Sequence, residues 1–227
     1  MIAQAKKLVY ELLKNDNSGH GIEHIERVYD LAMKFAESEK CDKTIVALGV
    51  LLHDVDDYKI FGMQSQLNLT NTRTILDKIG VSDQLKNIIL DMVSKIGFSK
   101  CLKGNRPTTI EGMIVSDADM CDAIGANGIL RANLFSYLHG ENFFDKNIFP
   151  QKQLDPNEYT KKNKTTTVNH FFEKILRLKN LMMTKAGKEE ALARHNLVVT
   201  FLRQFFEEEK AFDWIVYLDE YLKENGD

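Results

Sequence analysis

Apolar residues recur along most of the chain at the three- and four-residue spacing of an amphipathic helix. One clear stripe is formed by Ile25, Val28, Ala32, Phe35 and Ala36. Residues at this spacing share one face of a helix, so the stripe predicts a helix that begins near its first member. The strict alternation that marks a half-buried strand is not sustained at any point of the sequence. The pattern therefore predicts an all-α fold.

Further segments show the same helical period. The segment Lys43–Leu52 is almost entirely apolar, so we expect its helix to be buried. The other predicted helices cover residues 1–13, 68–79, 82–92, 171–183, 189–209 and 212–222. The chain has 3 prolines, all in segments that look like loops, which leaves long stretches free to be helical.

Two segments interrupt the helical pattern and are predicted to be loops. Residues 95–110 carry Lys95, Lys100, Lys103 and Arg106 without any acidic residue. Residues 140–167 are rich in lysine and have little apolar periodicity, and a loop of that length tends to serve a function.

The domain organisation predicted from this pattern is simple. The sequence contains no internal repeat and no evident domain linker. We therefore expect one domain over residues 1–227, with a core over about 1–130 and C-terminal helices and a loop over about 131–227.

Composition narrows the class of protein. The 30 Lys and Arg nearly balance the 33 Asp and Glu, and the formal charge of −3 gives no reason to expect nucleic acid as a partner. The longest apolar run is Ile45–Leu52, whereas a membrane span needs about 20 residues, so no membrane partner is expected. An odd number of cysteines, 3, without a secretory signal favours a cytoplasmic protein.

Candidate chemistry gathers around three of the six histidines. His20 and His24 are four residues apart and would share a helical face. The pair His53 and Asp54 ends the apolar run, where a carboxylate without a partner is costly to bury. A divalent cation would offset that cost, and imidazole with carboxylate suits Mn, Fe, Co, Ni or Zn better than Mg.

A second acidic cluster follows at Asp117, Asp119 and Asp122. The last two are three residues apart and could present two carboxylates from one face of a helix. Each feature alone also has an ordinary explanation: a lone core histidine is commonly a hydrogen-bonded structural residue. An acidic cluster commonly complements the dipole of a helix.

Taken in order, His24, the run Leu51–Leu52–His53–Asp54 and Asp119 resemble the H…HD…D signature of the HD-domain metal-dependent phosphohydrolases. Residues 19–28, 114–129 and 169–195 also look like the matching segments of small stand-alone bacterial members. The resemblance implies a helical HD-domain bundle with additional C-terminal helices. It implies one divalent metal ion, Mn, Mg, Fe, Co or Ni, held by His24, His53, Asp54 and Asp119.

The resemblance also suggests roles for neighbouring residues. We expect Asp57 to orient the attacking water or to relay its proton, and we expect Asp56 to be a solvated surface acid. His20 would be a catalytic residue that supports the metal site or binds phosphate, with a neutral core histidine as the alternative. Related proteins often have an acid directly after this histidine, where this chain has Gly21.

Phosphate binding requires cations as well as a metal. Arg27, one turn beyond His24, and Lys95 are the predicted substrate-binding cations, with Asp122 and Lys174 as further candidates. A solvent-facing position is the alternative for Lys174. For Lys100, Lys103 and Arg106, phosphate binding and a solvated loop are equally plausible. The aromatic residues expected to lie in the core are Phe171, Phe172, Phe205, Phe206 and Trp214.

The resemblance implies hydrolysis of a phosphoester or phosphoanhydride bond. We expect a small-molecule nucleotide substrate, first of all a nucleoside or deoxynucleoside triphosphate, with pyrophosphate released if water attacks the α-phosphorus. The enzymatic alternatives are a nucleoside monophosphate phosphatase and a cyclic-nucleotide phosphodiesterase. The non-enzymatic alternative is a metal-dependent nucleotide sensor. A homodimer is compatible with the sequence.

Overall fold

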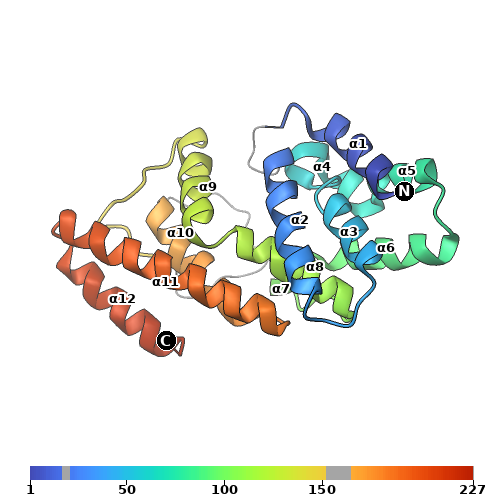
Figure 1. Ribbon diagram of the computed structural model, residues 1–227. Helices are drawn as coiled ribbons and strands as arrows, with labels where there is room; N and C mark the ends of the chain where they lie inside the picture. The colour runs from blue at the N-terminus through green and yellow to red at the C-terminus, as the bar shows by residue number, and fades with distance from the viewer. Residues whose placement is uncertain (17–20, 152–164, 227) are drawn as a thin grey trace. The chain divides into compact units, whose positions relative to one another are not determined.

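The computed structural model describes residues 1–16, 21–151 and 165–226, and their secondary structure is helical (Figure 1). Among these residues there is no β-strand, and the one isolated β-bridge joins Asn142 to Thr166. The predicted all-α fold is therefore confirmed. The chain divides into two compact units, which are described separately.

The first unit comprises Met1–Asp122 and Met183–Gly187. Its helices, in chain order, are α1 (Ile2–Leu13), α2 (Ile22–Ala36), α3 (Lys43–Leu52), α4 (Tyr58–Asn68), α5 (Thr70–Ile79), α6 (Asp83–Lys95), α7 (Phe98–Leu102) and α8 (Ile110–Asp122).

Helices α2, α3 and α8 pack against one another at the centre of this unit (Figure 1). Helix α3 begins where the side chain of Asp42 accepts hydrogen bonds from the backbone N–H groups of Thr44 and Ile45. Its residues from Val46 to Leu52 are all buried, as the apolar run predicts. The chain leaves this helix inside the core, and the polar pair His53 and Asp54 follows at that point.

A segment from late in the sequence completes the first unit. The buried carboxylate of Asp117 on α8 accepts hydrogen bonds from the backbone N–H groups of Met183 and Thr184, at 3.0 and 2.7 Å. The Thr184 hydroxyl donates to the same carboxylate at 2.8 Å. Gly187 packs so closely that a Cβ atom there would lie 2.4 Å from Asp117 Oδ2. These bonds hold the start of helix α11 in the first unit.

The second unit comprises Ala123–Met182 and Lys188–Asp227. Its helices are α9 (Gly125–Leu138), α10 (Thr167–Glu173), a 3-10 helix (Ile175–Leu181), α11 (Lys185–Glu208, which starts in the first unit) and α12 (Phe212–Glu224). Whether the two units act as the single domain expected from the sequence stays a prediction.

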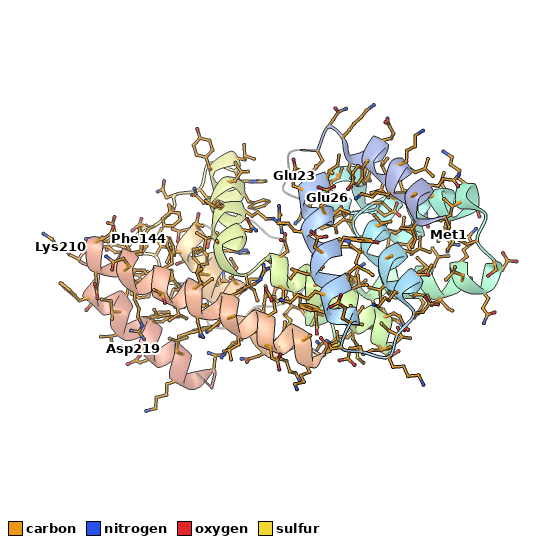
Figure 2. All side chains as sticks on the ribbon, in the orientation of Figure 1. Met1, Glu23, Glu26, Phe144, Lys210 and Asp219 are labelled. Carbon is orange, nitrogen blue, oxygen red and sulfur yellow. The ribbon has the colours of Figure 1, made fainter. Side chains whose placement is uncertain are left out.

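Aromatic rings form the core of the second unit. Phe144, labelled in Figure 2, lies 5.1 Å from Trp214 and 5.3 Å from Phe205, measured between ring centroids. Phe172 packs edge to face against Tyr221 at 5.3 Å. The predicted core residues Phe171, Phe172, Phe206 and Trp214 are at most 1% exposed, and Phe205 packs among them.

One predicted helix is wrong in its extent. Residues 171–183 were expected to form a single helix, but α10 ends at Glu173 and a 3-10 helix follows from Ile175. The carbonyl of Phe172 accepts hydrogen bonds from Arg177 Nε and the Tyr221 hydroxyl. Side chains thus take the acceptor that a continuous helix would use, although the apolar residues still face the core.

The predicted loop over residues 95–110 is also partly wrong, because it contains the short helix α7. Gly97, with φ of 122°, precedes α7 and allows a turn that few other residues adopt. Helices α4 and α9 were not expected. Residues 152–164, within the predicted loop over residues 140–167, lie outside the described residues.

The prediction that Asp56 is a solvated surface acid is wrong. Its side chain is buried and accepts hydrogen bonds from the Ser65 hydroxyl and from the backbone N–H groups of Asn71 and Thr72. The Thr72 hydroxyl donates a further bond of 2.7 Å. Helix α5 has no cap from its own preceding residue, Leu69. Asp56 therefore supplies the N-terminal cap of α5 from elsewhere in the chain.

Within the part of the chain that the structure describes, no helix combines the length and the apolar character needed to cross a bilayer. This agrees with the short apolar run of the sequence.

Replacing Asp56 with Asn is expected to lower the free energy of unfolding by about 2–3 kcal/mol, because the amide presents a donor to groups that themselves donate. Urea unfolding followed by far-ultraviolet circular dichroism would measure the loss. Asp77→Asn is a matched control, since the Asp77 side chain is exposed and pairs with Lys86. Equal stability of the two variants would contradict the capping role of Asp56.

The second unit contains a histidine whose burial makes stability depend on pH. His195 on α11 is 1% exposed, and burial, together with the charge of Lys179, lowers its pKa to about 4 from 6.5. Between these two values the unfolded chain binds a proton that the folded chain does not. Stability therefore falls as the pH is lowered through this window, by about 3 kcal/mol in all.

His195→Gln should remove this contribution and flatten the pH dependence. Fluorescence of Trp214, the only tryptophan and a residue of the second unit, reports the unfolding transition. His139→Gln, at an exposed position in the same unit, is the control and should leave the slope unchanged. A slope that persists in His195→Gln would show that other groups cause it.

Candidate metal centre

Three central helices of the first unit carry the candidate metal ligands. His24 lies in the first turn of α2, His53 and Asp54 follow the last residue of α3, and Asp119 lies in the last turn of α8. These helices pack against one another, so residues far apart in the sequence come together.

The four side chains converge on one point. The Nε2 atoms of His24 and His53 are 3.2 Å apart. Asp54 Oδ2 lies 3.4 Å from the first of these nitrogens and 3.5 Å from the second. Asp119 Oδ1 lies 3.5 and 3.7 Å from the same two atoms. One ligand atom each from His24, His53 and Asp119 fits within a span of 4.8 Å.

Hydrogen bonds fix which nitrogen of each imidazole faces this point. His53 Nδ1 lies 2.7 Å from the carbonyl oxygen of Val50, and His24 Nδ1 lies 2.7 Å from Asp122 Oδ2. Both partners can only accept, so each Nδ1 carries the hydrogen and each neutral imidazole points a bare Nε2 lone pair inward. Two lone pairs at 3.2 Å repel each other unless a cation lies between them.

The donor spacing fits a divalent cation. Metal–nitrogen bonds of about 2.0–2.1 Å with angles of about 90–110° place neighbouring ligand atoms about 3.0–3.4 Å apart. The spacing between the imidazole nitrogens falls in this range. Two imidazoles and two carboxylates form a donor set of the kind that binds first-row transition metals.

Burial differs among the four ligands in a way that suits a reactive site. The side chains of His24 and His53 are 1% exposed, whereas those of Asp54 and Asp119 are 13% and 21% exposed. The site therefore opens to solvent on its carboxylate side. A small molecule could reach a bound cation from there.

The charges inside the cluster shift the pKa values of its members. Burial would lower the pKa of His53, but the carboxylates of Asp54 and Asp119 outweigh it and raise this pKa. Burial would likewise raise the pKa of Asp119, but the adjacent imidazoles of His24 and His53 hold it below its usual range. The cluster thus keeps a negative oxygen next to the imidazoles.

Asp122 is predicted from the sequence to bind substrate, but in the structure its carboxylate binds the side chains of Arg27 and His24. It is fully buried, and Arg27 binds both of its oxygens, through Nε at 2.7 Å and a terminal nitrogen at 3.0 Å. The oxygen closer to the terminal nitrogen also accepts from His24. Asp122 therefore positions His24 and Arg27. The Arg27 side chain is 34% exposed, so part of it reaches solvent.

Among the described residues, no ion pair joins the predicted cation Lys95 to the four candidate ligands. It pairs with Asp91 one turn earlier on α6, at 2.7 Å. Lys100 on α7 is influenced by the site carboxylates. Burial lowers the pKa of Lys100, and the negative charges of Asp54, Asp57, Asp119 and Asp56 oppose that decrease.

Three predicted residues remain: Asp57, Lys174 and His20. Asp57 caps α4, where its Oδ1 accepts from the backbone N–H of Lys59 at 2.8 Å. Lys174 directly follows α10 in the second unit. His20 lies outside the described residues.

The sequence did not predict the structural roles of Asp122 and Asp56. It also did not distinguish Lys100 from the other basic residues of its segment. A signal existed for Asp122, since its spacing from Asp119 on one helix was noted, but spacing does not tell a ligand from a residue that orients a ligand. For Lys100 the signal was the acid-free segment around it. That segment contains several cations, and only the structure separates them.

Known proteins resemble this chain over the region of the candidate metal centre. A family model described as HD domain matches residues 21–124, which include the four converging side chains. The protein YpgQ of Bacillus subtilis (strain 168) is 33% identical over 202 residues, 88% of this chain and 90% of YpgQ.

Solved structures resemble the chain over a similar extent. A Lactobacillus plantarum protein shares 31% identity with a TM-score of 0.81, covering 92% of this chain and 97% of its own. The complex of Bacillus subtilis YpgQ with ADP shares 29% identity with a TM-score of 0.71 and the same coverage. An HD-superfamily hydrolase of Bacillus thuringiensis shares 30% identity, also with a TM-score of 0.71 and that coverage. This chain therefore belongs to the HD-domain superfamily and is one of its phosphohydrolases.

Proposed function

We propose that this protein hydrolyses nucleoside or deoxynucleoside triphosphates with the help of one divalent metal ion, releasing pyrophosphate. The observation that carries the proposal is the convergence of the two imidazole Nε2 atoms with the oxygens of Asp54 and Asp119. His24, His53, Asp54 and Asp119 would hold the ion. When bound, the ion polarises a phosphoryl oxygen and lowers the pKa of a water molecule.

The other residues of the site complete the chemistry. Asp57 is proposed to orient the attacking water and to take its proton, using Oδ2, the oxygen that the cap of α4 does not occupy. Water forms a bond to the α-phosphorus, and the bond to the bridging oxygen of the β-phosphate breaks. Pyrophosphate then leaves with that oxygen. Arg27, held by Asp122 and partly exposed, is proposed to bind a phosphate oxygen with its guanidinium group.

A nucleotide substrate is supported by the relatives. YpgQ, which matches nine-tenths of this chain, has been crystallised with ADP. In this proposal a chain of phosphates contacts the metal ion and the Arg27 guanidinium at the same time. We therefore rank triphosphates above monophosphates.

The experiment that tests the function is a nucleotide panel. Purified protein with Mn²⁺, and in parallel with Mg²⁺ and Co²⁺, should release pyrophosphate from nucleoside triphosphates. Products are resolved by anion exchange to tell pyrophosphate from phosphate. His53→Ala and Asp54→Ala should lose bound metal and turnover together while keeping their helix content.

Other outcomes of the panel would replace the proposal. Turnover of monophosphates or cyclic nucleotides in place of triphosphates would identify a phosphatase or a phosphodiesterase. Tight nucleotide binding without product would identify a sensor. Full activity of either alanine variant at trace metal would contradict the assignment of the ligands.

Asp122→Asn is expected to weaken metal binding about 10- to 100-fold, because an amide holds the His24 imidazole less firmly in its ligating orientation. The loss is measured by calorimetric titration with Mn²⁺. Asp91→Asn is the control: Asp91 is exposed and pairs with Lys95 in the same unit, so its loss should not change the affinity. Wild-type affinity in Asp122→Asn would show that this hydrogen bond does not support the metal site.

A further inference from the structure

Lys100 has an unusual setting for a lysine. Helix α6 packs against α3, whose end carries His53 and Asp54, and α7 follows α6 after the turn at Gly97. This turn brings Lys100 back over the end of α6, where its Nζ donates to the carbonyl oxygen of Val93 at 2.9 Å. The side chain is half-buried, and one of its three ammonium hydrogens is used in this way.

The ammonium group is close enough to the site to feel its charges, yet it makes no salt bridge with any carboxylate among the described residues. Asp54, Asp57 and Asp119 all act on it electrostatically. Its neighbours in sequence differ: Lys95 is paired with Asp91, and Lys103 is exposed. Lys100 is thus the lysine of this segment that is half-buried, feels the charges of the site carboxylates, and has two ammonium hydrogens that its bond to Val93 does not use.

A partly desolvated ammonium without a counter-ion costs free energy, which an anion can recover. In the absence of metal, the nearby carboxylates supply negative charge. A divalent cation bound by Asp54 and Asp119 would offset their two charges. The ammonium would then face a neutralised cluster, and the phosphate oxygens of a bound substrate would be the remaining partner.

We propose that Lys100 binds a phosphate oxygen of the substrate and selects polyphosphates over monophosphates. The inference rests on the proposed function and adds a specificity-determining contact to it. The carbonyl of Val93 takes one hydrogen of the ammonium group, and in this proposal the remaining hydrogens bind a phosphate beyond the one at the metal. A monophosphate would not extend to this contact.

The test compares metal binding with polyphosphate binding in the same variants. Lys100→Met keeps the length of the side chain and removes the charge, and Lys103→Gln is the matched control on an exposed lysine of the same segment. Calorimetry gives the affinity for Mn²⁺ alone, and then the affinity of the Mn²⁺-loaded protein for inorganic tripolyphosphate. Neither measurement requires turnover.

For Lys100→Met we expect tripolyphosphate to bind about 10- to 100-fold more weakly, the loss of one charge-assisted hydrogen bond. Mn²⁺ should bind equally well or more tightly, because a positive charge near the ion has been removed. With a nucleoside triphosphate as substrate, KM should rise more than kcat falls. Lys103→Gln should match the wild type throughout, and Lys100→Arg should recover most of the affinity.

The outcomes separate this inference from the proposed function. Equal tripolyphosphate affinity in wild type and Lys100→Met would overturn the inference and leave the function intact. Parallel loss of Mn²⁺ and tripolyphosphate in both Lys100→Met and Lys100→Arg would show a structural role and also overturn it. A wild-type protein that binds Mn²⁺ but neither binds tripolyphosphate nor hydrolyses nucleotides would overturn both.

Discussion

Two imidazole rings held nitrogen to nitrogen inside an apolar core are the constraint around which the first unit is built. Such a contact does not form by itself, because two lone pairs repel each other and both rings lose water. The Val50 carbonyl and the Asp122 carboxylate turn the rings of His53 and His24 so that both Nε2 atoms point at the same place. The packing of α2, α3 and α8 then supplies the free energy that keeps them there.

The helices, and the convergence of the four ligand residues, could be predicted from the sequence to different degrees. Long stripes with a clear period, such as the one on α2 and the apolar run of α3, give the correct elements because burial of one face dictates them. The order of His24, His53, Asp54 and Asp119 anticipates that they meet, and the structure brings them together. The sequence does not contain the distances, since these depend on how three helices pack.

What could not be predicted depends on contacts between residues distant in the sequence. Asp56 and Asp57 are adjacent and chemically identical, and no local pattern tells which one turns inward. In the structure, the Asp56 side chain caps α5 and the Asp57 side chain caps α4. The orientation of Lys100 likewise depends on one backbone angle at Gly97 and on a carbonyl seven residues back. Capping by a residue outside the helix leaves no trace in the spacing of the sequence.

The hydrogen bonds of Asp117 indicate that the region matched by the family model is smaller than the unit that folds cooperatively. The family model covers residues 21–124, yet Asp117 receives its hydrogen bonds from Met183 and Thr184. Helix α1, with Ala5, Val9 and Leu13 buried, also lies outside that range. A fragment cut to the boundaries of the family model would expose the apolar surface that α1 covers. It would also leave the buried carboxylate of Asp117 without its backbone hydrogen-bond donors. The region that the family model matches is therefore smaller than the cooperative unit, and an excised copy must carry both flanking pieces with it.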